Sequence, residues 1–116
     1  MNTPVSFEIA KVLKEKGFNI PQLYFYIDGD ISWKVDNTRC RNQIEGEYAA
    51  PTITEVVMWL YEKHGIWITV TSISQESWQC HMCRKGDSLG KCYLEDFYTP
   101  TEAYESAIEY TLKNLI

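Results

Sequence analysis

The sequence predicts a single α+β domain over residues 1–116, and three observations support this prediction. The length is close to the commonest domain size and long enough to bury a core without disulfides. Three segments have helical periodicity, and the segments between them read as strands. We therefore expect an antiparallel or mixed sheet of four to five strands packed with three helices, in the order helix, two strands, helix, two or three strands, helix.

The helices are predicted from capping residues and from the spacing of apolar residues. The first is expected over Ser6 to Lys16, with Thr3 as its cap and Pro4 at its first position. The second is expected over Thr52 to His64, where apolar residues recur at helical spacing and a glycine follows. The last begins after Thr99, whose hydroxyl can cap a helix that starts with proline.

The first pair of strands is predicted on either side of Asp28-Gly29, a strong two-residue turn signal. Gln22 to Ile27 is almost continuously apolar and aromatic, which is typical of an interior strand. The segment from Ile31 to Val35 alternates, as a half-buried strand does. Asp36 to Ala50 has no clear period, and we expect a long loop there.

Further strands are predicted after the second helix. Ile66, Ile68 and Val70 alternate with more polar positions and give one apolar face. Strands are also expected over Ser77 to Arg84 and over Lys91 to Glu95. Because the strands are joined mostly as hairpins, the sheet should be largely antiparallel.

Charge and composition exclude several classes of protein. The net charge is -5, and the lysines and arginines are scattered, whereas proteins that bind duplex nucleic acid concentrate positive charge. No apolar run approaches the roughly 20 residues of a membrane-spanning helix, so no membrane association is expected. The first residues lack the pattern of a secretory signal, which predicts a cytoplasmic protein with reduced thiols.

Two segments resemble small proteins encoded by Bacteroidetes phages and mobile elements. One is Ala50-Pro51-Thr52 followed by Trp59-Leu60 and Ile66-Trp67-Ile68, and the other is the ending from Thr99 to Ile116. The resemblance covers about a third of the chain and implies a phage or prophage origin, with the cytoplasm of a bacterial host as the location. Those proteins are uncharacterised, so the resemblance implies no activity.

The four cysteines are candidate zinc ligands. Cys80 and Cys83 have the spacing of a zinc knuckle, and Cys92 and Cys40 could complete four thiolates. If the segment is a strand, however, Cys80 and Cys83 point to opposite faces and cannot share a metal ion. The alternative is that the thiols are packed as small apolar residues.

No catalytic constellation is evident. Nucleophilic catalysis needs a cysteine or serine within reach of a base, and the two histidines are His64, at a helix end, and His81, beside Cys80. Neither a nucleophile elbow, a phosphate-binding loop nor a dinucleotide fingerprint is present. The sequence therefore favours a non-enzymatic protein without excluding an enzyme.

The aromatic residues exceed what one small core needs. Trp59, Tyr61 and Trp67 are the candidates for a partner-binding surface, because at least one of these rings should lie outside the apolar face of its element. The alternative is that the surplus rings form a second small core under the long loop. The main hypothesis is an accessory protein that binds an unknown protein partner or forms a homodimer, and the second hypothesis is a zinc-stabilised regulatory module.

The predicted order of helices and strands in the second half of the chain can be compared with that of an RNA-binding domain. Residues 52–116 are predicted to run helix, three strands, helix, which is the order of a double-stranded-RNA-binding domain. Such domains place a lysine-rich helix start on the phosphates. In this chain that position holds Glu102 and Glu105, so no binding to double-stranded nucleic acid is expected.

Overall fold

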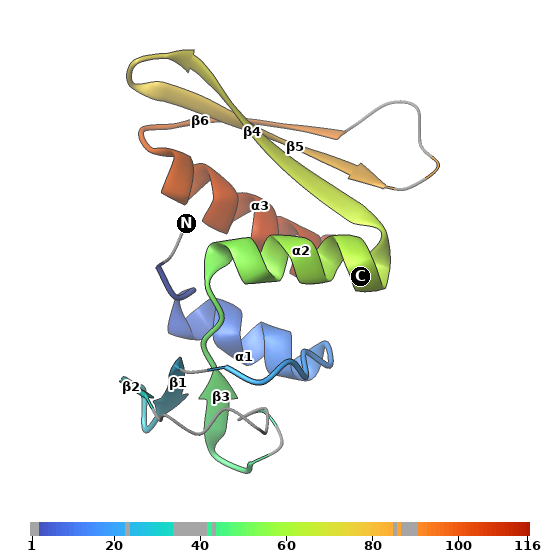
Figure 1. The fold of residues 1–116 in the computed structure, drawn as a ribbon. Coiled ribbons are helices and arrows are strands. Elements are labelled where there is room, and N and C mark those ends of the chain that lie inside the picture. Colours follow the sequence, from blue (N-terminus) through green and yellow to red (C-terminus); the bar gives the residue numbers. More distant parts are fainter. Residues whose placement is uncertain (1–2, 23, 34–41, 43, 85, 87–90) are drawn as a thin grey trace. The chain divides into compact units, whose positions relative to one another are not determined.

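The computed structural model describes most of the chain as two compact units (Figure 1). The described residues are 3–22, 24–33, 42, 44–84, 86 and 91–116, and the side chains of Trp33 and of residues 91–95 lie outside this description. The N-terminal unit is Asn2–Thr52, and the C-terminal unit is Ile53–Ile116. The single domain expected from the chain length stays a prediction.

The described chain is α+β, as predicted, with three helices and two three-stranded antiparallel sheets. The expectation of one sheet with four to five strands is wrong, because six strands are divided between the two units. The strand that was not predicted is β3 (Glu47–Ala49), which lies in the segment expected to be a loop. Three residues are too few to display the alternation from which a strand is predicted.

The N-terminal unit combines one helix with a small sheet. Helix α1 (Phe7–Glu15) precedes β1 (Tyr24–Ile27) and β2 (Asp30–Trp33), and β1 lies between β2 and β3, as its apolar sequence predicted. The Asp28-Gly29 turn is also confirmed, since Asp28 and Gly29 have φ angles of 53° and 82°. Positive φ at both central residues is the geometry of the tightest hairpin turns.

The first helix begins later than its sequence predicted. Ser6 is the N-cap, and its hydroxyl oxygen accepts a hydrogen bond from the Ile9 amide at 3.3 Å. Pro4 is not helical but forms an isolated antiparallel bridge with Thr52, and the Val5 amide donates to the Pro51 carbonyl at 2.9 Å. The segment before the helix is therefore extended, so Thr3 does not cap the helix.

Long-range side-chain hydrogen bonds hold the N-terminal unit together. The Asn42 amide group donates to the Phe18 carbonyl at 2.8 Å and accepts from the Ala49 amide at 2.7 Å. The Lys14 ammonium donates to the carbonyls of Ile44 and Glu47 at 3.1 and 2.9 Å. Both side chains satisfy backbone groups that three short strands do not pair.

The C-terminal unit has the predicted order of helix, three strands, helix. Its elements are α2 (Ile53–His64), β4 (Ile66–Ser74), β5 (Ser77–Arg84), β6 (Lys91–Phe97) and α3 (Pro100–Asn114). The strands form an antiparallel sheet in the order β4-β5-β6, which includes the third strand. The predicted start of the last helix is confirmed, because the Thr99 hydroxyl accepts the Glu102 amide at 3.1 Å.

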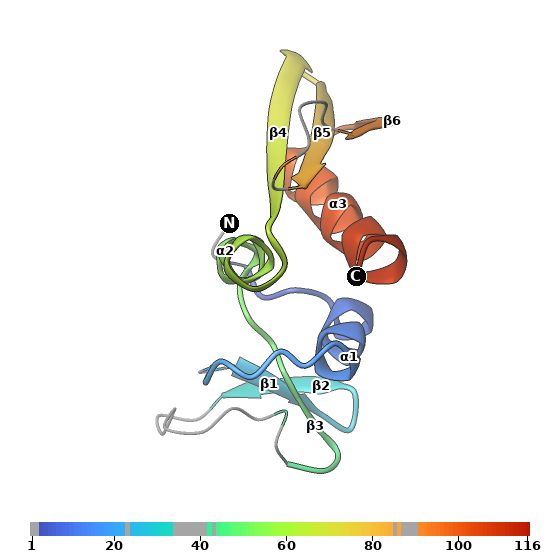
Figure 2. The same cartoon turned by 90° about the vertical axis from the view of Figure 1, so that its right-hand side faces the viewer.

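Both helices of the C-terminal unit lie on the same face of its sheet (Figures 1 and 2). The alternation predicted for β4 is confirmed, since Ile66 and Ile68 are buried whereas Trp67 and Thr69 are exposed. The helices contribute further buried apolar residues, which are Ile53, Val56, Val57, Leu60, Ala103, Ala107, Ile108 and Leu112. Full burial of an aliphatic side chain contributes roughly 1.5–3 kcal/mol, so this face is the core of the unit.

None of the described helices is long and apolar enough to cross a membrane.

Candidate functional site

The predicted zinc pair does not form a common site. Cys80 and Cys83 both lie in β5, and residues three apart in a strand point to opposite faces of the sheet. Cys80 is fully buried beside Met82, on the face that the helices cover, whereas Cys83 is half-buried on the other face. The two thiols therefore cannot bind one metal ion, and the hypothesis of a Cys80–Cys83 knuckle is corrected.

Two predicted ligands, Cys92 and Cys40, have side chains outside the described residues, so their part in a metal site stays a prediction. Cys92 lies in β6, where its backbone is in register with His81, and Cys40 is outside the described residues. The described residues contain no group of three or more histidine, cysteine or acidic side chains that could hold a metal ion.

The three aromatic residues predicted to bind a partner are placed differently from one another. Trp59 is buried in α2, with 3% of its surface exposed, and its ring packs edge-on against His64 at 4.9 Å between centroids. Tyr61 and Trp67 are 48% and 43% exposed. Trp59 thus belongs to the interior, and only the other two rings are available to a partner.

Tyr61 and Trp67 contact each other across the junction of α2 and β4. Their ring centroids are 5.3 Å apart, and the ring planes meet at 80° in an edge-to-face arrangement. Such a contact contributes about 0.5–1.5 kcal/mol beyond the buried area, so it restricts both rings. The contact therefore limits the orientations that the two exposed side chains can adopt.

Gly65 explains why these two elements meet. Its amide donates to the Tyr61 carbonyl at 3.0 Å, and its φ of 67° is a left-handed conformation that glycine adopts without strain. The helix therefore ends in a tight turn, and the next residues enter β4 at once. This reversal brings the last turn of α2 beside the start of the strand.

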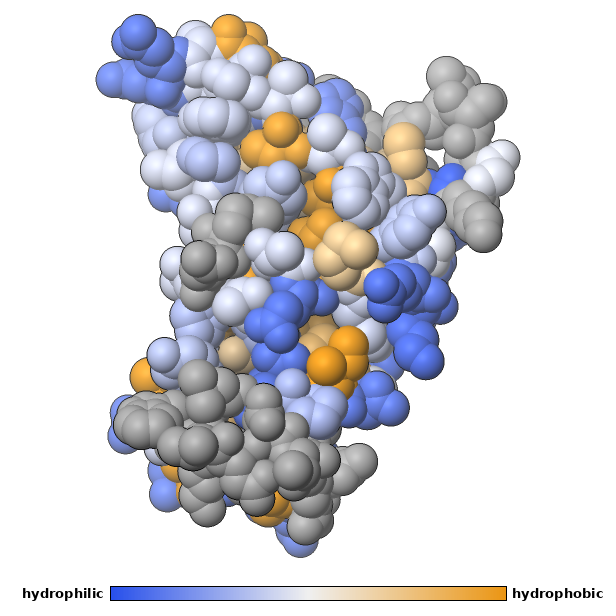
Figure 3. Space-filling model, viewed as in Figure 1, coloured by the Kyte–Doolittle hydropathy of each residue, from blue (hydrophilic) through white to orange (hydrophobic). Residues whose placement is uncertain are grey.

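Met58 extends the pair along α2. It lies one helical turn before Tyr61, on the same side of the helix, and it is 41% exposed. Figure 3 shows one side of the C-terminal unit, where apolar side chains reach the surface between hydrophilic ones. We call Met58, Tyr61 and Trp67 the aromatic surface. Sequence reasoning did not find Met58, although its spacing of three residues from Tyr61 was the available signal.

The open face of the sheet continues from the aromatic surface. Thr69 and Thr71 follow Trp67 along β4 and are exposed, and their register partners in β5 are His81 and Gln79. These β5 side chains are half-buried, and both helices lie on the opposite face of the sheet (Figure 2). The positions that follow Trp67 on this face of β4 and β5, Thr69, Thr71, Gln79 and His81, are therefore polar.

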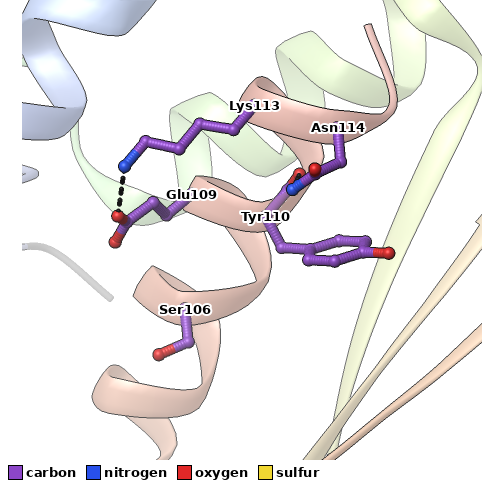
Figure 4. Close-up of a pocket in the computed structure, with 5 residues that line it drawn as sticks. All are labelled: Ser106, Glu109, Tyr110, Lys113 and Asn114. Carbon is purple, nitrogen blue, oxygen red and sulfur yellow. Dashed lines mark hydrogen bonds and ion pairs between the residues drawn. The ribbon is translucent and has the colours of Figure 1, made fainter.

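A hollow of about 210 Å³ lies along α3 (Figure 4). The described residues that line it are Ser106, Glu109, Tyr110, Lys113 and Asn114. Glu109 and Lys113 form an ion pair at 2.6 Å, and the Asn114 side chain donates to the Tyr110 carbonyl at 3.1 Å. The described lining includes neither a histidine nor a cysteine.

The first half of α3 is acidic. Burial raises the pKa of the Glu105 carboxyl above its ordinary value, and the neighbouring charges of Glu102 and Glu109 act in the same direction. The expectation that the chain does not bind double-stranded nucleic acid stays a prediction.

No protein-family model, curated protein or solved structure significantly matches this chain.

Proposed function

We propose that this chain is a non-catalytic accessory protein that binds a protein partner through the aromatic surface of its C-terminal unit. The observation that carries the proposal is the Tyr61–Trp67 pair, which is held edge-to-face at 5.3 Å while almost half of each ring stays exposed. Tryptophan and tyrosine are the residues most enriched at the energetic centres of protein interfaces.

The position of the aromatic surface supports the proposal. It is built from the last turns of a helix and the first residues of a strand, not from a long loop. Side chains on regular elements keep their geometry, and aromatic rings lose few torsions on binding. Both properties lower the entropy cost of association.

The charges around the aromatic surface are consistent with the rim of an interface. Glu62 and Lys63 follow Tyr61 in α2 and are exposed. Interfaces usually combine an apolar centre with a polar, solvated rim. The partner should therefore offer an apolar recess with polar groups around it.

The proposal includes a phage or mobile-element origin, so the partner would be a bacterial or phage protein. The support is the resemblance of residues 50–68 and 99–116 to small proteins of that origin. The proposed surface lies within the first of these segments, because Met58, Tyr61 and Trp67 all fall between residues 50 and 68.

The test compares the Tyr61→Ala/Trp67→Ala variant with Tyr98→Ala. Tyr98 is 77% exposed and lies just after β6, so it controls for the loss of an exposed aromatic ring. A protein captured from bacterial extract by the immobilised wild-type chain is purified and titrated against each variant. We expect the double variant to bind at least about 30-fold more weakly, because removing an interface centre costs 2 kcal/mol or more. The control should bind like the wild type.

An unchanged dissociation constant for the double variant would contradict the proposal. Circular dichroism and thermal unfolding of the same variants establish that the comparison is made between folded proteins.

A further inference from the structure

The two edges of the β4-β5-β6 sheet differ in charge. The edge strand β6 (Lys91–Phe97) contains Lys91, Glu95 and Asp96 in its sequence. The other edge strand, β4 (Ile66–Ser74), has the sequence IWITVTSIS, with no charged residue, proline or glycine. Natural proteins protect sheet edges with charges, prolines or short strands, because an unprotected edge pairs with another strand. By this criterion β6 is protected and β4 is not.

The β4 strand is also long and regular. From Ile66 to Ser72 it keeps an unbroken register with β5, and the irregularity occurs only between Ser72 and Ser74. Seven residues in regular register span roughly 23 Å at about 3.3 Å per residue. Within the described part of the chain, β5 is the only strand that pairs with β4. Its other edge offers backbone donors and acceptors to a new strand.

The side chains of β4 leave this edge accessible. Thr69, Thr71 and Ser72 are exposed, and Val70 is half-buried although it points to the helix-covered face. In Figure 2, β4 lies at one side of the sheet, and both α2 and α3 pack against it. An added strand would therefore continue the sheet and also cover Val70.

We propose that β4 pairs antiparallel with β4 of a second copy of this chain, which joins two three-stranded sheets into one of six strands. The net charge of -5 makes two copies repel each other, and a neutral edge is where they can approach at the lowest electrostatic cost. A two-fold axis through Val70 places Thr69 of one copy opposite Thr71 of the other, so the cross-strand pairs are compatible.

This inference goes beyond the proposed function, because it uses the backbone edge of β4, which shares only Trp67 with the aromatic surface. Met58 and Tyr61 lie in α2, so they can be changed without altering the strand. An experiment can therefore contradict the pairing of β4 without contradicting the proposed function, and the reverse is also true.

The experiment measures mass by native mass spectrometry and sedimentation over a concentration series. The wild-type chain is expected to be a dimer. In the Thr69→Lys/Thr71→Lys variant, like charges meet across the two-fold axis, and we expect a monomer with an unchanged circular dichroism spectrum. The Thr69→Ser/Thr71→Ser variant is the neutral control and should stay dimeric.

A charge-complementation experiment distinguishes a loss of strand pairing from misfolding of the variants. The Thr69→Glu/Thr71→Glu variant should also be monomeric alone, whereas a mixture of the lysine and glutamate variants should form a heterodimer. A monomeric wild type overturns the inference, and the edge of β4 would then be open to a strand other than β4 of a second copy. A dimer that survives the lysine variant but is lost in Met58→Ala/Tyr61→Ala also overturns it, since the copies then meet through the aromatic surface.

Discussion

The N-terminal unit contains a group of aromatic rings that pack together, whereas the aromatic pair of the C-terminal unit is exposed. The group consists of Phe7, Tyr26 and Tyr48. Phe7 lies 5.3 Å from Tyr26 and 5.5 Å from Tyr48, and the Tyr26 hydroxyl donates to the Val5 carbonyl at 2.7 Å. All three rings are half-buried. We call them the N-terminal aromatic cluster.

Lysine side chains complete that cluster. The ammonium groups of Lys11 and Lys14 lie 5.0 and 4.7 Å from the ring centroids of Phe7 and Tyr48. In the aromatic surface, by contrast, Tyr61 and Trp67 contact each other while about half of each ring stays exposed. The comparison teaches that a surplus of aromatic residues does not identify an interface. The packing around each ring distinguishes a structural cluster from an exposed pair.

The largest expected loss of stability comes from removing one ring of the N-terminal aromatic cluster. We expect Phe7→Ala to lower the free energy of unfolding by about 2–3 kcal/mol, because it deletes two ring contacts and half-buried apolar surface. Tyr61→Ala should cost less than about 1 kcal/mol, since the ring is already exposed and has one ring contact. Urea denaturation followed by circular dichroism measures both values. Equal losses would remove the distinction between the two groups.

An intermediate effect is expected from Asn42, which supports the N-terminal unit from outside its helix and strands. Asn42→Ala removes hydrogen bonds to Phe18 and Ala49 and leaves two backbone groups unsatisfied, so we expect a loss of about 2 kcal/mol. The matched control is Asn114→Ala in α3, where the exposed side chain bonds only to the carbonyl four residues earlier. The control should cost less than about 0.5 kcal/mol. A similar cost at both positions would show that the long-range bonds of Asn42 do not stabilise the unit.

The smallest expected change in stability comes from the charge of Glu105 and depends on pH. The pKa of Glu105 is raised in the folded chain, so its ionised form is less stable there than in the unfolded chain. Below its ordinary pKa of 4.5 the carboxyl is neutral in both states, and folding loses stability as the pH rises through the folded-state pKa. Glu105→Gln should therefore raise the melting temperature slightly at pH 7 and leave it unchanged near pH 3.

The control for this prediction lies in the N-terminal unit. Glu8 in α1 is exposed and forms an ion pair with Lys11 at 3.4 Å, so Glu8→Gln should give no gain at pH 7. Thermal unfolding of both variants at the two pH values is the measurement. A gain that persists at pH 3 for Glu105→Gln would mean that the charge of this residue is not the cause.

Much of the local structure could be predicted because each signal lies within a few neighbouring residues. The Asp28-Gly29 turn, the Thr99 cap and the alternation from Ile66 to Thr69 depend on local chemistry, and the structure confirms all three. The start of α1 was misplaced because Thr3 and Ser6 can both cap a helix. The pairing of Pro4 with Thr52, far along the chain, decides between them.

The candidate site could be predicted only in part. The spacing of Cys80 and Cys83 fits a metal knuckle as well as a strand, and the pairing of β5 with both neighbours selects the strand. Trp59 and Tyr61 are only two residues apart in α2, yet one is buried and the other exposed. Sequence spacing placed them on different sides of the helix, but only packing shows which of the rings remains accessible.

By itself, the sequence determined the three helices apart from the start of α1, the Asp28-Gly29 turn, the alternation of β4 and the absence of charge along that strand. The tertiary structure decided that the strands form two sheets, that β4 lies at an edge, and that Tyr61 and Trp67 meet while Trp59 is buried. The physical reason is the range of the interactions. Capping and periodicity act over a few residues, whereas strand order and burial depend on contacts between segments that are distant in the chain.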